Sequence, residues 1–143
     1  MENGLTGLVS MSARIPEAFD DLFDRPIVVV LATVMPDGQP QVTPMWYDQH
    51  GDQIWVNSAI GRQKDRNMRA RPQVAVSVVD PDNPYRWLEV RGRVVEMATG
   101  EAAVAHMDGL AQKYMNRATY PLPAGEQRCI YKIEPTRVNA SRG

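Results

Sequence analysis

The sequence is poor in cysteine and histidine, and its charges nearly cancel. A single cysteine, Cys129, excludes an internal disulfide, and its strand-like neighbours indicate a buried thiol instead of a nucleophile. The two histidines, His50 and His106, are far apart and show no zinc-ligand spacing, so we expect no metal site. A net charge of −1 argues against a protein that coats nucleic acid.

Long apolar runs are also missing. No run approaches the roughly 20 apolar residues of a membrane helix. The first residues lack the basic flank and apolar core of a signal peptide. We therefore expect a cytoplasmic protein with no membrane partner. The 143 residues fit one domain with a real core, with residues 1–13 expected to be mobile because they mix Gly, Ser and Asn.

Apolar segments bounded by turn residues predict a mainly β (α+β) protein. The expected strands are 26–34, 39–47, 53–59, 73–79, 85–97 and 128–133. Pro36-Asp37-Gly38 predicts a tight turn that joins the first two as a hairpin. Pro44 lacks an N–H donor and predicts an interruption of the second strand, and Gly92 predicts a bulge or sharp bend in the fifth.

Helical spacing of apolar residues predicts two or three helices. They are 15–24, a basic helix that follows Gly61 and ends at Arg71-Pro72, and 99–114 with Thr99 as its N-cap. Six mostly antiparallel strands with short connections favour a β-barrel, since closure removes exposed sheet edges.

The stretch 54–72 changes from an apolar strand into a basic helix. Asn57-Ser58 end the strand and Gly61 turns the chain. Five cations follow: Arg62, Lys64, Arg66, Arg69 and Arg71. A helix start has free N–H groups and a positive dipole end, so acidic residues are normally preferred there. Cations in that turn favour a bound phosphate or carboxylate, which the N–H groups and the cations would hold together.

The simpler interpretation of this stretch is a solvated helix face, because Arg and Lys are good helix formers. The spacing matches neither a P-loop nor a GxGxxG dinucleotide fingerprint. A local basic cluster in a chain of balanced charge suits a small anionic ligand better than a duplex. The residues alone leave both interpretations open.

Several short motifs follow one another in a characteristic order. They are Val29-Val30-Leu31-Ala32-Thr33, Pro36-Asp37-Gly38-Gln39-Pro40, Val42-Thr43-Pro44-Met45-Trp46-Tyr47, Arg62-Gln63-Lys64-Asp65-Arg66-Asn67-Met68 and Pro72-Gln73-Val74-Ala75. This set resembles the pyridoxamine 5′-phosphate oxidase-like split β-barrel family, and within it most the deazaflavin (coenzyme F420)-dependent oxidoreductase branch. The resemblance covers most of the chain, from about 15 to 138.

The resemblance implies a six-stranded antiparallel split β-barrel that forms a homodimer, with cofactor sites at the interface. The cofactor-binding residues that it implies are Thr33, Gln39, Thr43, Pro44, Met45, Trp46, Ser58, Arg62, Lys64, Arg86 and Trp87. Arg62 and Lys64, near Ser58, would hold the cofactor phosphate. The strand 43–46 would lie along the ring, and residues 85–87 from the partner subunit would close the pocket.

Simpler roles exist for some of these residues. Taken singly, Trp46, Trp55 and Trp87 are typical of core packing, and Arg86 could form a surface ion pair with Asp82.

The implied function is hydride transfer between reduced F420 and a small organic acceptor. The alternatives are an FMN-dependent oxidoreductase of the same fold, a non-catalytic flavin- or deazaflavin-binding protein, and a structural dimer whose helix 62–71 is only solvated. No side chain needs to act as a nucleophile, because the cofactor carries the chemistry. Tyr47, His50 and Tyr85 are candidate proton donors, and solvent is an equal alternative.

Overall fold

A computed structural model describes the backbone of residues 9–142 and the side chains of residues 13–141. Residues 1–8, most of the segment expected to be mobile, lie outside the described part. Val9–Ser12, also expected to be mobile, instead form a strand, β1, which pairs antiparallel with residues 138–141 near the C-terminus. No helix in the described part of the chain is long and apolar enough to cross a membrane.

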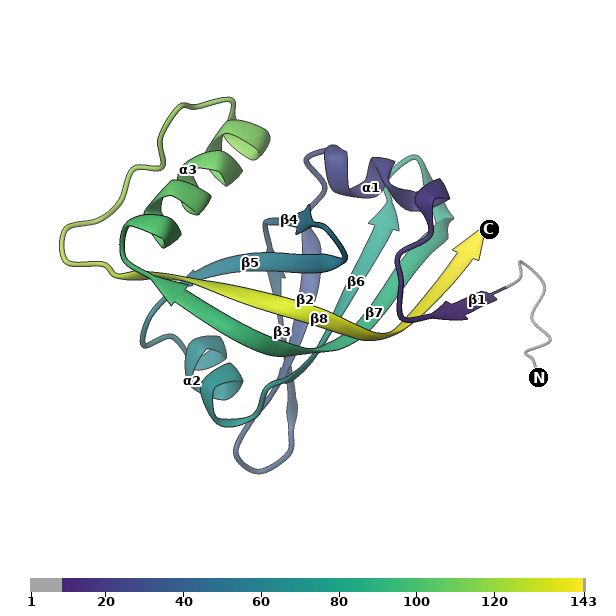
Figure 1. Cartoon of the computed structure of the whole chain (residues 1–143), viewed down its shortest axis with the longest axis horizontal. Coiled ribbons are helices and arrows are strands. Elements are labelled where there is room, and N and C mark those ends of the chain that lie inside the picture. Colours follow the sequence, from purple (N-terminus) through teal and green to yellow (C-terminus); the bar gives the residue numbers. More distant parts are fainter. Residues whose placement is uncertain (1–8, 143) are drawn as a thin grey trace.

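Eight strands and four short or medium helices make up the described chain (Figure 1). After β1 the strands are β2 (Val29–Val34), β3 (Pro40–Met45), β4 (Tyr47–His50), β5 (Gln53–Ala59), β6 (Gln73–Asp80), β7 (Asn83–Thr99) and β8 (Arg128–Arg142). The helices are the 3₁₀ turn η1 (Glu17–Phe19), α1 (Asp21–Asp24), α2 (Gln63–Ala70) and α3 (Glu101–Met115).

The strands form one antiparallel sheet whose two edges are neighbours in sequence. The strand order is β3-β2-β6-β7-β8-β5-β4, with β1 added beside β8. Strands β3 and β4 therefore lie at opposite edges, yet only Trp46 separates them along the chain. Because one residue spans a few ångströms, the edges must meet at Trp46. The sheet is thus curled and joined at this point, which is the split-barrel architecture expected.

The predicted strand 39–47 corresponds to two strands, since β3 ends at Met45 and β4 begins at Tyr47 and continues to His50. We expected Pro44 to interrupt it, whereas the ladder continues through Pro44, which lies opposite Val30. Strand β3 is an edge strand, and an edge tolerates proline because one of its sides has no neighbouring strand. The break occurs at Trp46, and it adds β4, so with β1 the sheet has two strands more than the six predicted.

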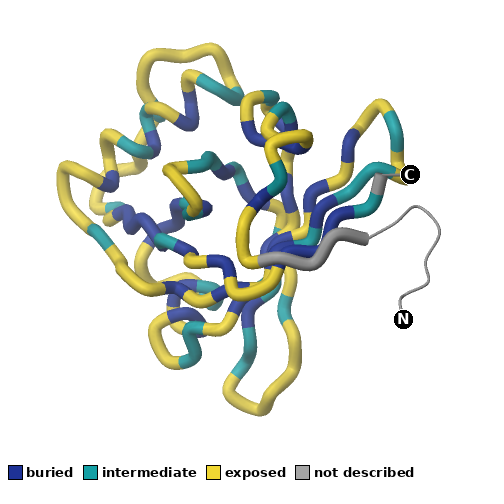
Figure 2. The backbone as a smooth tube through the Cα atoms, turned by 45° about the vertical axis from the view of Figure 1, so that its right-hand side comes forward, coloured by how far each residue is buried: buried dark blue, intermediate teal, exposed yellow. Residues whose placement is uncertain are grey.

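The core fills the inside of the curled sheet and the contact between the sheet and the short N-terminal helices (Figure 2). Alternating residues of β2 and β6 point inward, such as Leu31 and Val76, both at most 1% exposed. The predicted bend at Gly92 is confirmed, since the β7–β8 register shifts there. A Cβ on Gly92 would lie 2.5 Å from the Glu134 carbonyl oxygen, so only glycine allows these strands to approach.

The helices differ from prediction mainly at their ends. The predicted helix 15–24 is split into η1 and α1, with Phe19, Leu22 and Phe23 buried. Helix α3 begins at Glu101 after Gly100, whose φ is +73°, whereas the predicted N-cap Thr99 ends β7 opposite Cys129. The thiol of Cys129 is buried, as predicted. Helix α3 packs against β8, β7 and β5, and α2 packs against β2.

Candidate functional site

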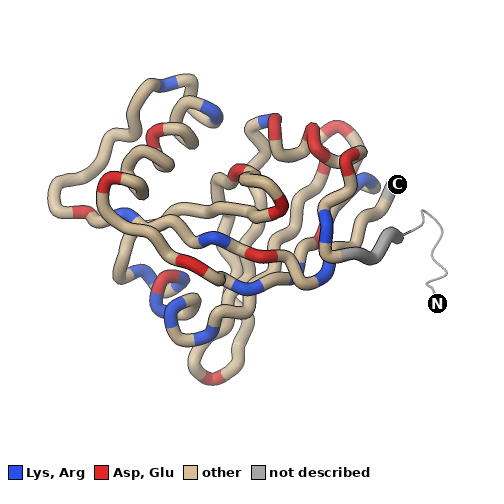
Figure 3. Tube along the Cα trace, viewed as in Figure 1, with Lys and Arg blue, Asp and Glu red and all other residues tan. Residues whose placement is uncertain are grey.

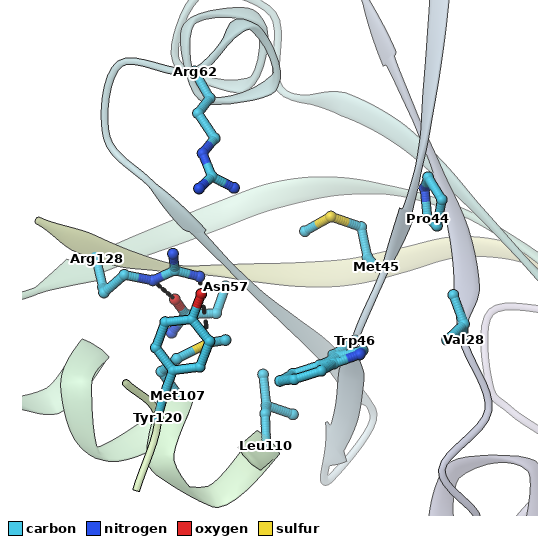
Figure 4. Close-up of a pocket in the computed structure, with 10 residues that line it drawn as sticks. All are labelled: Val28, Pro44, Met45, Trp46, Asn57, Arg62, Met107, Leu110, Tyr120 and Arg128. Atoms are coloured by element: carbon cyan, nitrogen blue, oxygen red, sulfur yellow. Dashed lines mark hydrogen bonds between the residues drawn. The ribbon is translucent and has the colours of Figure 1, made fainter. Parts of the chain in front are cut away.

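A cavity of about 330 Å³ opens between the Trp46 junction, the start of α2 and helix α3 (Figure 4). Its lining residues are Val28, Pro44, Met45, Trp46, Asn57, Arg62, Met107, Leu110, Tyr120 and Arg128. One side of the cavity is apolar and aromatic, and two guanidinium groups lie on the other side. Ligand sites of small molecules commonly combine an apolar wall with a few polar groups of this kind.

Trp46 forms the aromatic wall because it joins the two sheet edges. Its ring stacks on Tyr114 of α3, with centroids 5.0 Å apart and planes 7° from parallel. The ring of Tyr120 meets it edge-on, with centroids 6.4 Å apart. The tryptophan is therefore held between the barrel and the segment that follows α3. None of the three tryptophans belongs to the buried core, so the core-packing alternative for them is wrong.

The opposite side of the cavity carries clustered positive charge. Arg62 is half-exposed and Arg128 is 97% buried, with only 3% of its side chain exposed. Burial, followed by the charges of Arg62 and Arg128, lowers the pKa of Lys64. Lys64 has no hydrogen bond or ion pair with the described residues. The Glu126 carboxylate faces both guanidinium groups, 2.8 Å from Arg128 and 3.6 Å from Arg62.

Helix α2 carries many cations (Figure 3), but most of them make bonds within the chain. Arg66 donates to the Gly61 carbonyl and to Gln63 Oε1. Arg71 donates to the Val34 carbonyl at 2.8 Å. Arg69 pairs with Asp65 at 2.8 Å. Of the five cations between positions 62 and 71, Lys64 has no such partner among the described residues and Arg62 has only the 3.6 Å ion pair with Glu126, so these two are the best placed of the five to act on a ligand.

The buried carboxylate of Asp65 organises the start of α2, and the sequence interpretation missed it. It accepts hydrogen bonds from the Gly61 N–H at 2.9 Å, from Arg69 and from the Tyr131 hydroxyl. Burial alone would raise the pKa of Asp65, but these hydrogen bonds hold it below its usual range. The Gly61 N–H therefore has an acceptor inside the chain. An acidic residue four positions before Arg69 was the available clue.

Arg128 is held in place by a chain of polar contacts that sequence spacing did not reveal. Its Nε donates to Asn57 Oδ1 at 2.9 Å. Asn57 Nδ2 donates to the Ala103 carbonyl and to His106 Nδ1, each at 3.0 Å. His106 Nε2 lies 2.8 Å from Asp48 Oδ1. Arg128 was visible only as the first residue of the last strand, and its place beside Asn57 follows from the β5–β8 pairing.

Asp48, His50 and His106 bring together three side chains of metal-ligating types, with ligand atoms within 4.8 Å of one another. The two histidines, which are far apart in sequence, thus lie close together, with ring centroids 6.0 Å apart and both within 3.0 Å of Asp48. Asn57 must present its oxygen to Arg128 and its amide to Ala103, so His106 Nδ1 is an acceptor and Nε2 carries the proton. Burial would raise the pKa of Asp48, but the bonds from both histidines keep it low. These hydrogen bonds connect the group to Asn57, which lines the cavity.

The cavity brings together four of the implied cofactor-binding residues: Pro44, Met45, Trp46 and Arg62. Thr43 and Ser58 lie beside this set in sequence, and both hydroxyl oxygens are buried without a hydrogen-bond partner among the described residues. A buried polar atom without a partner costs about 1–3 kcal/mol. Such atoms are candidates for contacts with a bound ligand.

The other implied cofactor-binding residues do not line this cavity: Thr33, Gln39, Thr43, Ser58, Lys64, Arg86 and Trp87. Thr33 is buried and bonded to Gln41 and Asn67, and Gln39 lies in the exposed β2–β3 turn. Arg86 pairs with Asp21 and Asp80. It therefore forms ion pairs, but not with Asp82, which pairs with Arg25.

The candidate proton donors also lie elsewhere. The Tyr47 hydroxyl is buried and donates to the Leu22 carbonyl at 2.5 Å. The His50 ring stacks on Trp55 with centroids 3.6 Å apart, and Tyr85 is 72% exposed. Tyr120, which the sequence interpretation did not single out, is the tyrosine that lines the cavity.

Comparison with solved structures places the chain among proteins of this fold. A structure described as an F420 reductase is 41% identical, with a TM-score of 0.78, and the match covers 87% of this chain and 98% of that one. The conserved hypothetical protein Rv2991 from Mycobacterium tuberculosis is 23% identical, with a TM-score of 0.71, over 90% of this chain and 86% of that one. HupZ from Group A Streptococcus is 20% identical, with a TM-score of 0.64, over 90% and 99%. The last two show the fold alone.

The search of curated proteins found no match. The family model described as pyridoxamine 5′-phosphate oxidase matches residues 15–142, which include every strand from β2 to β8 and the whole cavity. The chain belongs to the pyridoxamine 5′-phosphate oxidase family.

Proposed function

We propose that this protein is an oxidoreductase that transfers a hydride between reduced coenzyme F420 and a small organic acceptor. The observation that carries the proposal is the cavity itself, in which the Trp46 wall and the Arg62 guanidinium face one space of about 330 Å³. The 41% identity to a structure described as an F420 reductase supports the deazaflavin over other ring systems. F420, when bound, supplies the hydride chemistry.

The residues present fit such a group. A ring needs a flat apolar wall, which Met45 and Trp46 provide, and a phosphate needs cations, which Arg62 and Lys64 provide. The hydroxyl oxygens of Thr43 and Ser58, buried without partners, are available to polar atoms of the ligand. We infer that Arg62 and Lys64 bind the phosphate and that the strand 43–46 lies along the ring.

In this proposal the chain's residues bind, orient and exclude water instead of forming a covalent bond. Trp46, held between Tyr114 and Tyr120, fixes the plane of the wall. Met107 and Leu110 of α3 keep the acceptor side apolar. The Tyr120 hydroxyl is the group of the cavity that is best suited to donate a proton, with solvent as the other source.

We propose a homodimer whose second copy covers the outer face of β2, β3 and β6. Val30 lies opposite Pro44 and Ser77 in the two ladders, so these residues share that face. Valines on the face are exposed by 41% to 62%: Val28, Val30, Val42 and Val79. Trp87 lies opposite Val79 on the same face. An apolar sheet face of this kind is typical of a protein interface, and Val28 and Pro44 also line the cavity.

Titration of cofactor-free protein with F420 and, separately, with FMN tests the proposal through ligand fluorescence. Tight F420 binding with weak FMN binding, followed by hydride transfer to acceptors in a screen, is the expected result. The reverse order of affinity would make the protein an FMN-dependent oxidoreductase, and tight binding without turnover would make it a cofactor carrier. Binding of neither would overturn the proposal and leave α2 as a solvated basic helix.

A further inference from the structure

Glu126 is a carboxylate that contacts two cations lining the cavity. Its Oε2 lies 2.8 Å from Arg128 Nη1, and its Oε1 lies 3.6 Å from Arg62 Nη2. The two guanidinium groups come from segments far apart in sequence, the start of α2 and the start of β8, and both lie on the side of the cavity opposite Trp46 (Figure 4). A carboxylate in this position makes the same kind of contacts that a ligand phosphate or carboxylate would make.

The charges around Glu126 do not balance. Arg62, Lys64 and Arg128 act on this region, and Glu126 is the single carboxylate that pairs with any of them among the described residues. The Arg128 side chain is only 3% exposed, so water screens its charge weakly. Excess positive charge in a poorly solvated place is unfavourable by itself, and an anionic ligand would relieve it.

Arg128 is also held in a fixed orientation before any ligand arrives. Asn57 Oδ1 accepts from its Nε, and its guanidinium carbon lies 5.3 Å from the centroid of the Tyr120 ring. Its Nη2 has only the weak acceptor Sδ of Met107, at 3.3 Å. The guanidinium thus keeps donor capacity that strong acceptors of the chain do not use.

We propose that Arg128 is a third cation of the ligand's anion site, and that Glu126 occupies the place of the ligand's anion until the ligand displaces it. The inference rests on the proposed function, in which Arg62 and Lys64 bind a phosphate. Glu126 and the ligand compete for the same donors of Arg62 and Arg128, so removal of the Glu126 charge strengthens anion binding. Glu126 belongs to the 116–127 segment, and its side chain, 17% exposed, has access to solvent when it leaves.

The test compares Glu126→Gln and Arg128→Lys with wild type by isothermal titration at low ionic strength. The probes are inorganic pyrophosphate, F420 and FMN. We expect Glu126→Gln to tighten binding of pyrophosphate and of the cofactor about 3- to 10-fold, because a competing ion pair is removed. Arg128→Lys keeps the charge but loses the planar fork and the Nε donor, and we expect it to weaken binding about 10-fold.

Glu101→Gln is the matched control. It removes the same charge from an exposed position on α3, and its affinities should equal those of wild type. Unchanged or weaker binding by Glu126→Gln would overturn the inference, as would wild-type affinity in a folded Arg128→Lys variant. If thermal denaturation shows that the Arg128→Lys variant does not fold, the affinity of the Glu126→Gln variant alone decides whether the inference holds.

The inference and the proposed function can fail separately. If wild type binds neither F420 nor FMN while pyrophosphate affinity follows the expected order, the function fails and the anion site remains. If wild type binds F420 tightly and Glu126→Gln leaves the affinity unchanged, the function remains and the inference fails.

Discussion

Asn57 Nδ2 lies 3.0 Å from His106 Nδ1, and this contact fixes which histidine nitrogen carries the proton. Asn57 cannot reverse its amide, because its oxygen accepts from Arg128 and its nitrogen donates to Ala103. One buried asparagine therefore links β5, α3 and the first residue of β8 at the edge of the cavity.

Replacement of Asn57 by alanine should destabilise the protein. It leaves Arg128 Nε and the Ala103 carbonyl without their partners in a buried place, and we expect a loss of about 1–3 kcal/mol in the free energy of unfolding. Urea denaturation of the variant and of Asn83→Ala measures this. Asn83 caps an exposed turn by accepting from the Tyr85 N–H, so its removal should cost far less. Equal losses in the two variants would contradict the assigned role of Asn57.

Arg62→Ala and Lys64→Ala should each weaken F420 binding. Each removes one charge-assisted contact worth about 1.5–3 kcal/mol, which corresponds to roughly 10- to 150-fold in affinity. Arg66→Ala is the control on the same helix, because Arg66 bonds only to Gly61 and Gln63. Fluorescence titration of the three variants gives the comparison, and wild-type affinity in both Arg62→Ala and Lys64→Ala would rule out the phosphate anchor.

Asp65→Asn should lower stability at neutral pH and much less in acid. The pKa of Asp65 in the folded protein is below its ordinary 3.8, so its stabilising effect is present above that value and disappears as the pH falls through the folded pKa. Urea denaturation of wild type and variant at a series of pH values from 7 downward measures the difference, which we expect to be about 1–3 kcal/mol at pH 7 and to shrink steadily below pH 3.8. A difference that is as large in acid as at pH 7 would show that the charge of Asp65 has no such effect.

Val42→Glu should convert the proposed dimer into a monomer. Val42 is 62% exposed on the outer face of β3, and a carboxylate buried there in an interface would have no partner. Sedimentation velocity gives the mass of the variant. Val95→Glu is the control, since Val95 is 53% exposed and lies on β7 beyond its pairing with β6. A monomeric wild type, or a Val42→Glu variant that stays dimeric, would contradict the interface.

Local patterns predicted the elements well where local chemistry determines them. The β2–β3 hairpin follows from Pro36-Asp37-Gly38, and its Gly38 has the φ of +90° that such a turn favours. The bend at Gly92 was equally readable, because a strand glycine usually marks a close approach. Arg62, which the change from apolar strand to basic helix singled out in the sequence, lines the cavity.

Features that depend on distant segments were not predictable from one sequence. The place of Arg128 beside Asn57 requires the β5–β8 register, which pairs residues about 70 positions apart. The break at Trp46 arises because β3 pairs at one edge of the sheet and β4 at the other, which the sequence does not show. The missing N–H of Pro44 therefore received too much weight as the cause of a break. The sequence shows the cations between positions 62 and 71 but not their acceptors, which include Asp65 for Arg69 and the Val34 carbonyl for Arg71.

Trp46 also limits how freely this protein can change its ligand. The same residue joins the two halves of the barrel and forms one wall of the cavity, so a substitution there alters the scaffold and the binding surface together. Tyr120, which lines the cavity, and Glu126, which contacts two of its cations, belong to a connecting segment between α3 and β8. We therefore expect new acceptor specificities to be obtained by redesign of residues 116–127, with the tryptophan side left unchanged.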